Sequence, residues 1–275
     1  KVNAGSLDNS DSGVLSSESA QTLTLTGTLN NAQGGLIDSG ADLGITAKRL
    51  DNTKATINAK QDIRFIGTDL DNTEGVLASD AAVNLDLLGT LINTKGQVVA
   101  AGPLAITRAA QINNQGGKLV SQKLLSLSTG GLDNRNGGTV AANDNLTLTA
   151  SGAVQNSGGL IYSDAADLQL NAASLDNAGG SLQSEGALTV KVGGAIDNQK
   201  GRLVAKSGNL DVTAASLDSR GGVLSSLKSA FTAQIGGLLR NGQGGVIQAQ
   251  HVTLKALAGL DNESGRIAAQ SGDTT

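Results

Sequence analysis

An asparagine recurs along the whole chain every 20, 21 or 22 residues, and this period restricts the fold more than any other feature. Thirteen copies follow one another without a gap, and a serine replaces the asparagine in one of them. A sustained period of this length indicates a solenoid, in which each copy forms one turn and packs on its neighbours. The series is Asn9, Asn31, Asn52, Asn72, Asn93, Asn114, Asn134, Asn156, Asn177, Asn198, Ser219, Asn241 and Asn262.

Each asparagine ends a short motif in which a branched apolar residue comes two positions earlier and a glycine three positions later, as in Leu175-Asp176-Asn177 with Gly180. Ala55 replaces the glycine in one copy, and in the first copy Gly13 comes one residue late. We expect the asparagine to turn inward at a corner and its amide to bond the equivalent asparagines one turn up and one turn down, as an Asn ladder. The glycine is expected to adopt a backbone conformation that other residues resist.

Two apolar residues two positions apart occur in every copy between successive asparagines, and no helical spacing is present. This spacing places both residues on one face of a strand. With the run after the glycine and the Leu-x-Asn triplet, each period contains three short strands, which describe one triangular coil. The pairs are Leu23/Leu25, Leu43/Ile45, Ile63/Phe65, Val83/Leu85, Leu104/Ile106, Leu125/Leu127, Leu146/Leu148, Leu168/Leu170, Leu188/Val190, Leu210/Val212, Phe231/Ala233 and Val252/Leu254.

The fold predicted for the chain is therefore all-β, a parallel β-helix of about 13 coils, which would make a rod of roughly 60 Å at the spacing of paired strands. The chain holds 38 Gly, one Pro, two Phe and no Met or Trp, so Leu, Ile, Val and Ala must fill the core. The composition does not shift along the chain, and we expect residues 1–275 to form one continuous domain that is a fragment of a longer chain.

Charge and composition exclude several classes of function. The net charge is −4 and no stripe of Lys and Arg is present, which argues against nucleic-acid binding. The sequence contains no run of 18 apolar residues, so it predicts no transmembrane helix. The first 20 residues do not resemble a signal peptide. The absence of cysteine excludes a disulfide scaffold and a Cys-ligated metal site.

The residues that suggest chemistry are few. His251 is the single histidine and has no second histidine or cysteine to share a metal. The Asp of the triplet recurs in columns, which we interpret as a solvated face; weak Ca²⁺ binding and a carboxylate pair for glycoside cleavage are the alternatives. Because the copies differ by at most two residues in length, no coil has room for loops that wall a cleft. We predict no cofactor, no metal site and no catalytic residue. The Asp series is Asp8, Asp51, Asp71, Asp133, Asp176, Asp197, Asp218 and Asp261.

The pattern Leu-Asp-Asn…Gly…Leu…Leu-x-Leu, clearest over Leu175–Val190 and Leu260–Ala268, resembles the haemagglutinin repeats of filamentous-haemagglutinin-type exoproteins. The resemblance covers essentially the whole chain. It implies a right-handed β-helical shaft that an outer-membrane transporter of two-partner secretion exports, and a protein that is secreted or held at the bacterial cell surface.

The resemblance implies a non-enzymatic stalk that supports adhesion to host or neighbouring cells. The shaft of a contact-dependent growth inhibition protein, which delivers a toxin, is the first alternative. A β-helical polysaccharide-active enzyme is an alternative of another class. The partners expected are the transporter and a host-cell glycan or protein receptor. We expect a monomer, with end-to-end association where terminal coils expose strand edges.

Overall fold

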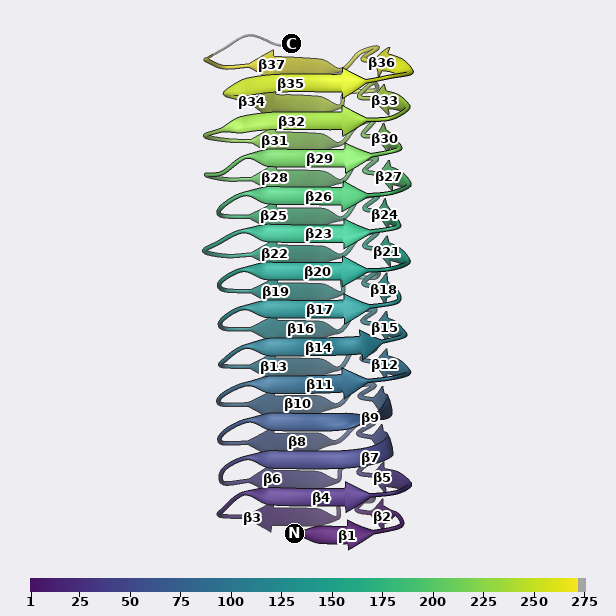
Figure 1. Ribbon diagram of the computed structural model, residues 1–275, viewed down its shortest axis with the longest axis vertical. Coiled ribbons are helices and arrows are strands. Elements are labelled where there is room, and N and C mark those ends of the chain that lie inside the picture. Colours follow the sequence, from purple (N-terminus) through teal and green to yellow (C-terminus); the bar gives the residue numbers. More distant parts are fainter. Residues whose placement is uncertain (272–275) are drawn as a thin grey trace. The chain divides into compact units, whose positions relative to one another are not determined.

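Alternating apolar residues and short turns produce three parallel strands in most turns of this chain, as the repeat predicts. The computed structural model describes residues 1–271, and within them it contains strands and turns and no helix. The chain divides into two compact units, residues 1–133 and 134–275. Strands of successive turns pair in parallel within each unit (Figure 1).

In the N-terminal unit, residues 1–133, six first strands form one sheet, and the second and third strands form another. The first strands are β3 (Val14–Ser17), β6 (Leu36–Ser39), β8 (Thr56–Ala59), β10 (Val76–Ser79), β13 (Gln97–Ala100) and β16 (Lys118–Ser121). The second strands are β1 (Val2–Ala4), β4 (Gln21–Leu25), β11 (Val83–Leu87), β14 (Leu104–Ala109) and β17 (Leu125–Thr129), and the third strands are β2 (Leu7–Asp8), β5 (Thr28–Asn30), β12 (Thr90–Ile92), β15 (Gln111–Asn113) and β18 (Leu132–Asp133). In two turns the second and third strands are continuous, as β7 (Leu43–Asp51) and β9 (Ile63–Asp71).

In the C-terminal unit, seven first strands lie within residues 134–271, which brings the chain to about 13 turns of a parallel β-solenoid. The first strands are β19 (Thr139–Ala142), β22 (Leu160–Ser163), β25 (Ser181–Ser184), β28 (Arg202–Ala205), β31 (Val223–Ser226), β34 (Val246–Ala249) and β37 (Arg266–Ala269). The second strands are β20 (Leu146–Ala150), β23 (Leu168–Ala172), β26 (Leu188–Val192), β29 (Leu210–Ala214), β32 (Ala230–Ile235) and β35 (His251–Ala256). The third strands are β21 (Ala153–Gln155), β24 (Ser174–Asp176), β27 (Ala195–Asp197), β30 (Ser216–Asp218), β33 (Leu238–Arg240) and β36 (Gly259–Asp261).

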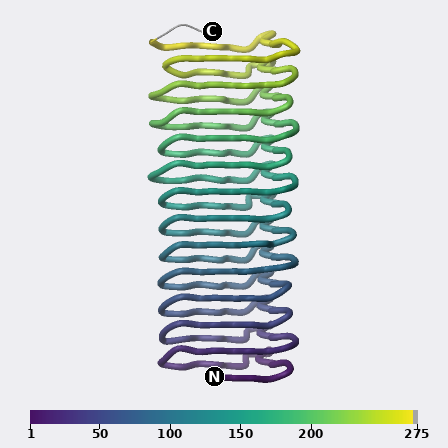
Figure 2. Tube along the Cα trace, viewed as in Figure 1, coloured from purple at the N-terminus to yellow at the C-terminus, as the bar shows by residue number. Residues whose placement is uncertain are grey.

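The pairing is in register, so equivalent side chains form columns along each unit, and Figure 2 shows successive turns following nearly the same path within a unit. Leu188 pairs with Leu210, and Leu210 with Phe231, all three fully buried. Phe65 is fully buried in the N-terminal unit, so both phenylalanines belong to the core as predicted. Burying each such side chain stabilises the fold by about 1.5–3 kcal/mol. The right hand and the triangular section of the coil, and its extent as one domain over 1–275, stay predictions.

The corner after each asparagine contains a residue in the left-handed backbone region, two positions beyond the asparagine in most turns. Glycine occupies this position at Gly179 and Gly221, but lysine occupies it at Lys54, Lys95 and Lys200, with φ between 54° and 56°. A side chain with a Cβ is disfavoured in this region.

We therefore expect Lys200→Gly to raise the free energy of unfolding by about 0.5–1 kcal/mol, because glycine relieves the left-handed strain at an exposed position. Urea unfolding followed by far-UV circular dichroism measures the change. Lys200→Ala is the matched control: it removes the same charge and keeps the Cβ. Equal stabilisation by both variants would mean that charge, and not backbone strain, is responsible.

Candidate functional site

The repeated asparagines of the N-terminal unit lie in one buried column at the corner that follows the third strand. Asn31 Nδ2 donates to Asn52 Oδ1 at 2.8 Å, and Asn52 Nδ2 donates to Asn72 Oδ1 at 2.7 Å. Asn72 and Asn93 continue the column with the same geometry, at 2.8 Å and 2.7 Å to the next Oδ1. These amides form a continuous run of hydrogen bonds from Asn9 to Asn114, within which each side chain after Asn9 is fully buried.

The C-terminal unit contains a second such column, interrupted once. Asn134, Asn156 and Asn177 each donate Nδ2 to the following Oδ1 at 2.7 Å. Asn198 Nδ2 instead donates to Ser219 Oγ at 3.0 Å, because serine stands where the next amide would be. The column resumes between Asn241 and the half-buried Asn262, at 2.8 Å.

In most turns the glycine three residues after the asparagine is required by close packing, and our expectation of an unusual backbone conformation for it is wrong in those turns. Gly180 does not have a positive φ, whereas Gly179 before it does, at 62°. A Cβ on Gly180 would lie 2.1 Å from the carbonyl oxygen of Asn156 and 2.7 Å from Asn177 Oδ1. Glycine is needed here because the backbone of one turn approaches the ladder asparagine of the turn before it.

The sequence motif also misplaces this glycine in some turns. Where the corner is one residue longer, the close-packed glycine comes four residues after the asparagine: Gly35 lies against Asn31, and Gly245 against Asn241. The glycines that the motif counted there, Gly34 and Gly244, have φ of 83° and 81°, so at these two positions the expected backbone conformation is present. The two glycines of a Gly-Gly pair thus have different roles. The first adopts a left-handed backbone conformation, and the second leaves room for the ladder asparagine against which it packs.

The aspartates of the triplet close the corner from outside. Asp176 Oδ1 accepts the backbone N–H of Ala178 at 3.0 Å, and Asp51 Oδ1 accepts that of Thr53 at 3.1 Å, each two residues ahead. This is an Asx turn, which a carboxylate or a carboxamide side chain can form. Asn113 in the same place accepts the N–H of Gln115 at 3.2 Å. The acidic column therefore has a local structural use.

Among the described residues, no group of three His, Cys, Asp or Glu side chains has the geometry to hold a metal ion. Asp176, Asp197 and Asp218 do lie in register on β24, β27 and β30. Asp218, however, is engaged by Arg220, whose Nη2 lies 2.6 Å from Asp218 Oδ2 and whose Nε lies 2.9 Å from Oδ1. Sequence reasoning missed this pair, although an arginine two residues after the aspartate signals it.

Two opposing effects act on the pKa of the Asp218 carboxyl. Burial raises this pKa, but hydrogen bonds from the side chain and backbone of Arg220, with the charges of Arg220 and Arg240, lower it by more. The net result is a pKa below the usual value. A carboxyl with a depressed pKa in the folded state stabilises the fold above its ordinary pKa, and the stabilisation is lost as the pH falls through the folded-state pKa.

We expect Asp218→Asn to lower stability by up to about 1 kcal/mol at pH 7, since asparagine keeps the Asx turn and loses the ion pair at a partly exposed site. The difference from the unmodified chain should begin to shrink as the pH falls below about 4, the ordinary pKa of an aspartate, and should vanish once the pH is below the lower folded-state pKa. Thermal unfolding across this pH range measures it, with Arg220→Gln as the control that removes the same pair from the other side. A difference that persists at low pH would exclude the ion pair as its cause.

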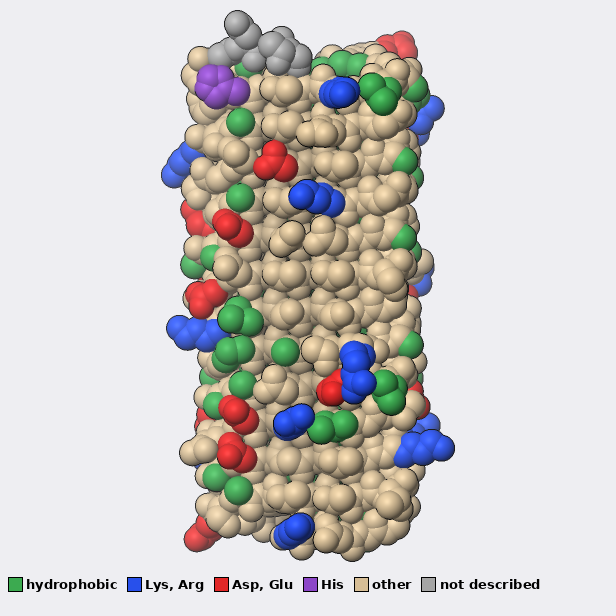
Figure 3. Space-filling model, in the orientation of Figure 1, with side chains coloured by type: hydrophobic (Ala, Val, Ile, Leu, Met, Phe, Trp, Pro, Cys, Tyr) green, Lys and Arg blue, Asp and Glu red, His purple; other side chains and the backbone are tan. Residues whose placement is uncertain are grey.

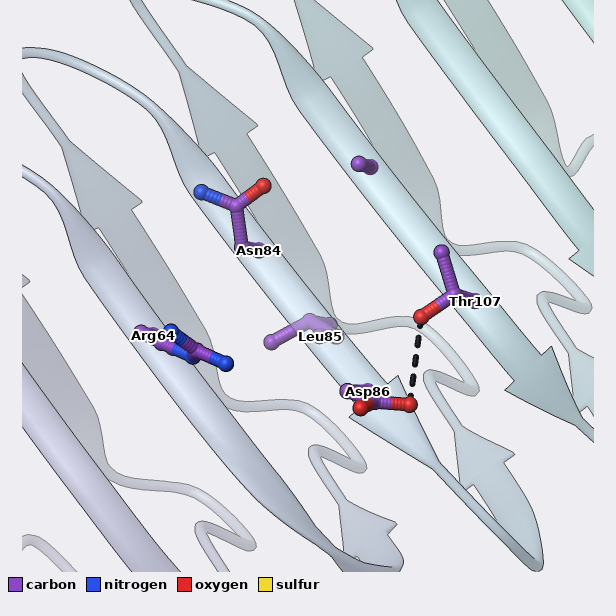
Figure 4. A pocket seen from close by; sticks show the side chains of 6 residues that line it. Arg64, Asn84, Leu85, Asp86 and Thr107 are labelled. Carbon is purple, nitrogen blue, oxygen red and sulfur yellow. Dashed lines mark hydrogen bonds between the residues drawn. The ribbon is translucent and has the colours of Figure 1, made fainter.

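The surface has shallow depressions, and one of them lies across β9, β11 and β14 (Figure 4). It measures about 370 Å³ and is lined by Arg64, Asn84, Asp86 and Thr107. Thr107 Oγ1 donates to Asp86 at 3.2 Å, and Arg108 Nε donates to the same carboxylate at 2.6 Å. The hydrogen bond from Arg108 holds the pKa of Asp86 below its usual value. Arg108 has φ of 61° at an irregularity in β14, which the sequence did not signal.

The other residues considered from the sequence stand apart from one another. His251 is exposed at the start of β35, and Tyr162 is half-buried on β22. On the face drawn in Figure 3, charged side chains are scattered singly among the backbone, hydrophobic side chains and other uncharged side chains. Among residues 1–271 the structure offers no helix that could span a bilayer. The stacked turns suit a rigid scaffold, and the scattered surface side chains suit weak polar contacts.

Comparison with known proteins agrees with this architecture. The haemagglutinin repeat family model matches residues 2–116, 99–158, 163–205 and 186–272. No curated protein and no solved structure matches the chain. The matched ranges cover nearly all of the chain and include the asparagine columns of both units. The chain belongs to the haemagglutinin repeat family of filamentous-haemagglutinin-type exoproteins.

Proposed function

We propose that this chain is a segment of an extracellular stalk that holds a binding or effector module away from a bacterial surface and so supports adhesion to host or neighbouring cells. The observation that carries the proposal is the uniformity of the turns. Equivalent residues of consecutive turns pair in register within each unit, and the asparagine column repeats with each turn except at Ser219. In such a repeat structure, the number of turns sets the distance at which a module at one end is held from the other end.

The family supports the remaining parts of this proposal. Its exoproteins are exported by two-partner secretion, so an outer-membrane transporter is the partner proposed for export, and the secreted or surface-attached state is the location proposed. A host glycan or protein receptor is the proposed target of the complete exoprotein. The stalk is proposed to have no catalytic activity. Turnover of uronate or neutral polysaccharides by the purified chain, with or without Ca²⁺, would overturn that part.

A stalk predicts that length can change by whole turns without loss of the fold. Deleting residues 178–198 removes one period of 21 residues. It joins Asn177 to Gln199, which begins the corner that follows Asn198 in the full chain. We expect a folded protein that is shorter by about 4.8 Å, the spacing of paired strands. Small-angle X-ray scattering gives the longest dimension, and circular dichroism gives the strand content.

Deleting residues 178–187 is the matched control. It removes about half a period, places strands out of register with their neighbours, and should lose the cooperative unfolding transition. A compact particle in scattering, or equal tolerance of both deletions, would contradict the stalk. A full-period deletion that folds and shortens as expected would support it.

A further inference from the structure

The serine at position 219 leaves a polar atom in the core of the C-terminal unit without a hydrogen bond. Asn241 is fully buried, and its Oδ1 has no hydrogen-bond partner. Ser219, one turn earlier, is also fully buried. A buried acceptor without a partner costs about 1–3 kcal/mol, so a native fold seldom leaves one.

An unbroken turn shows which bonds the serine cannot make. Asn177 Nδ2 donates to the carbonyl oxygen of Gly180 at 3.3 Å, to Asn198 Oδ1 at 2.7 Å and to the carbonyl oxygen of Arg202 at 3.2 Å. One amide nitrogen thus connects its own corner, the next asparagine and the next first strand. The same three acceptors recur from turn to turn because the pairing is in register.

At Ser219 the equivalent acceptors are the carbonyl oxygen of Gly222, Asn241 Oδ1 and the carbonyl oxygen of Val246. The serine hydroxyl takes the place of the amide oxygen and not of the amide nitrogen. It accepts from Asn198 Nδ2 at 3.0 Å, as an Oδ1 does elsewhere. It also lies against the following glycine as Oδ1 does: a Cβ on Gly222 would be 3.0 Å from Ser219 Oγ, and one on Gly201 would be 2.6 Å from Asn198 Oδ1.

We propose that this turn binds one water molecule close to the position that Nδ2 of the ladder asparagine occupies in the other turns. Replacing asparagine by serine removes the carbon and one polar atom of the amide group, which frees space on the order of one water, about 30 Å³. The water accepts the Ser219 hydroxyl hydrogen and donates to Asn241 Oδ1 and to the carbonyl oxygen of Gly222 or Val246. It therefore has three partners, the usual number for a buried water.

The direction of these bonds selects water over a cation. Ser219 Oγ already accepts a hydrogen bond from Asn198, so its own hydrogen must be donated to a lone pair. A cation has no lone pair to accept that hydrogen. Asn241 Oδ1, in contrast, needs a donor. A neutral molecule that accepts once and donates twice meets both needs.

High-resolution crystal structures of this chain and of Ser219→Asn test the proposal. We expect one density peak at about 2.7–3.2 Å from both Ser219 Oγ and Asn241 Oδ1, and we expect it to be absent in Ser219→Asn, where Nδ2 fills the position. The corner at Asn177 is the internal control and should show no peak. If the site is dry while surface waters are well defined, or if Ser219 turns to donate directly to Asn241, the proposal is overturned. A negative water-to-amide nuclear Overhauser effect at the Asn241 side chain tests it in solution, without the variant, and its absence would count against the bound water.

Discussion

Replacing Asn177 with alanine should lower the free energy of unfolding by about 3 kcal/mol. The side chain is fully buried, and its Nδ2 donates to Gly180, Asn198 and Arg202. Its Oδ1 accepts from Asn156 at 2.7 Å. Alanine would leave Asn198 Oδ1 without its donor, deprive Asn156 of one acceptor and open a small cavity. Urea unfolding with circular dichroism detection measures the loss.

Ser219→Ala is the matched control, because it makes the same small residue at the equivalent position of another turn. Ser219 Oγ accepts a single hydrogen bond, from Asn198, and Asn241 Oδ1 has no protein partner even with serine present. We therefore expect this variant to lose about 1 kcal/mol or less. Equal losses in the two variants would show that the amide column contributes little and that packing alone holds the corner.

The sequence predicted the fold well because two independent signals have the same period. The apolar pairs identify a strand face, and the asparagines identify one corner per turn, so turn length, strand direction and core follow together. Leu188 and Leu210 are fully buried and in register, as the repeat requires. Register could be predicted because an error of one residue would expose every apolar side chain of a strand.

The detail of the corners could not be predicted in the same way. Gly34 and Gly180 both come three residues after a ladder asparagine, yet Gly34 has a positive φ and Gly180 lies against the ladder, and only the length of the corner distinguishes them. The Asx turn formed by Asp176 could not be predicted either, because an aspartate that forms such a turn and one that only faces solvent are the same residue in the sequence. The pair of Asp86 with Arg108 joins neighbouring turns across a strand irregularity, which periodicity does not reveal.

Replacing Gly180 with alanine should lower the free energy of unfolding by about 2 kcal/mol, although alanine adds one methyl group only. The new Cβ would lie 2.1 Å from the carbonyl oxygen of Asn156, which belongs to the backbone of the turn below and cannot rotate away. The two turns must separate locally, and the hydrogen bond from Asn156 to Asn177 lengthens with them. The measurement is the same urea titration, supported by the side-chain amide signals of the ladder in NMR spectra.

Gly179→Ala controls for the change of residue type. Gly179 has a positive φ, and a Cβ there would meet no atom within 4 Å, so the expected cost is backbone strain of about 1 kcal/mol with the ladder undisturbed. Ala55, buried at the equivalent position after Asn52, shows that one turn of this fold accommodates a Cβ there. Gly180→Ala should therefore fold and shift the Asn156 and Asn177 amide signals, whereas Gly179→Ala should leave them in place. A greater loss in Gly179→Ala would mean that φ, and not the approach of two turns, determines where glycine is required.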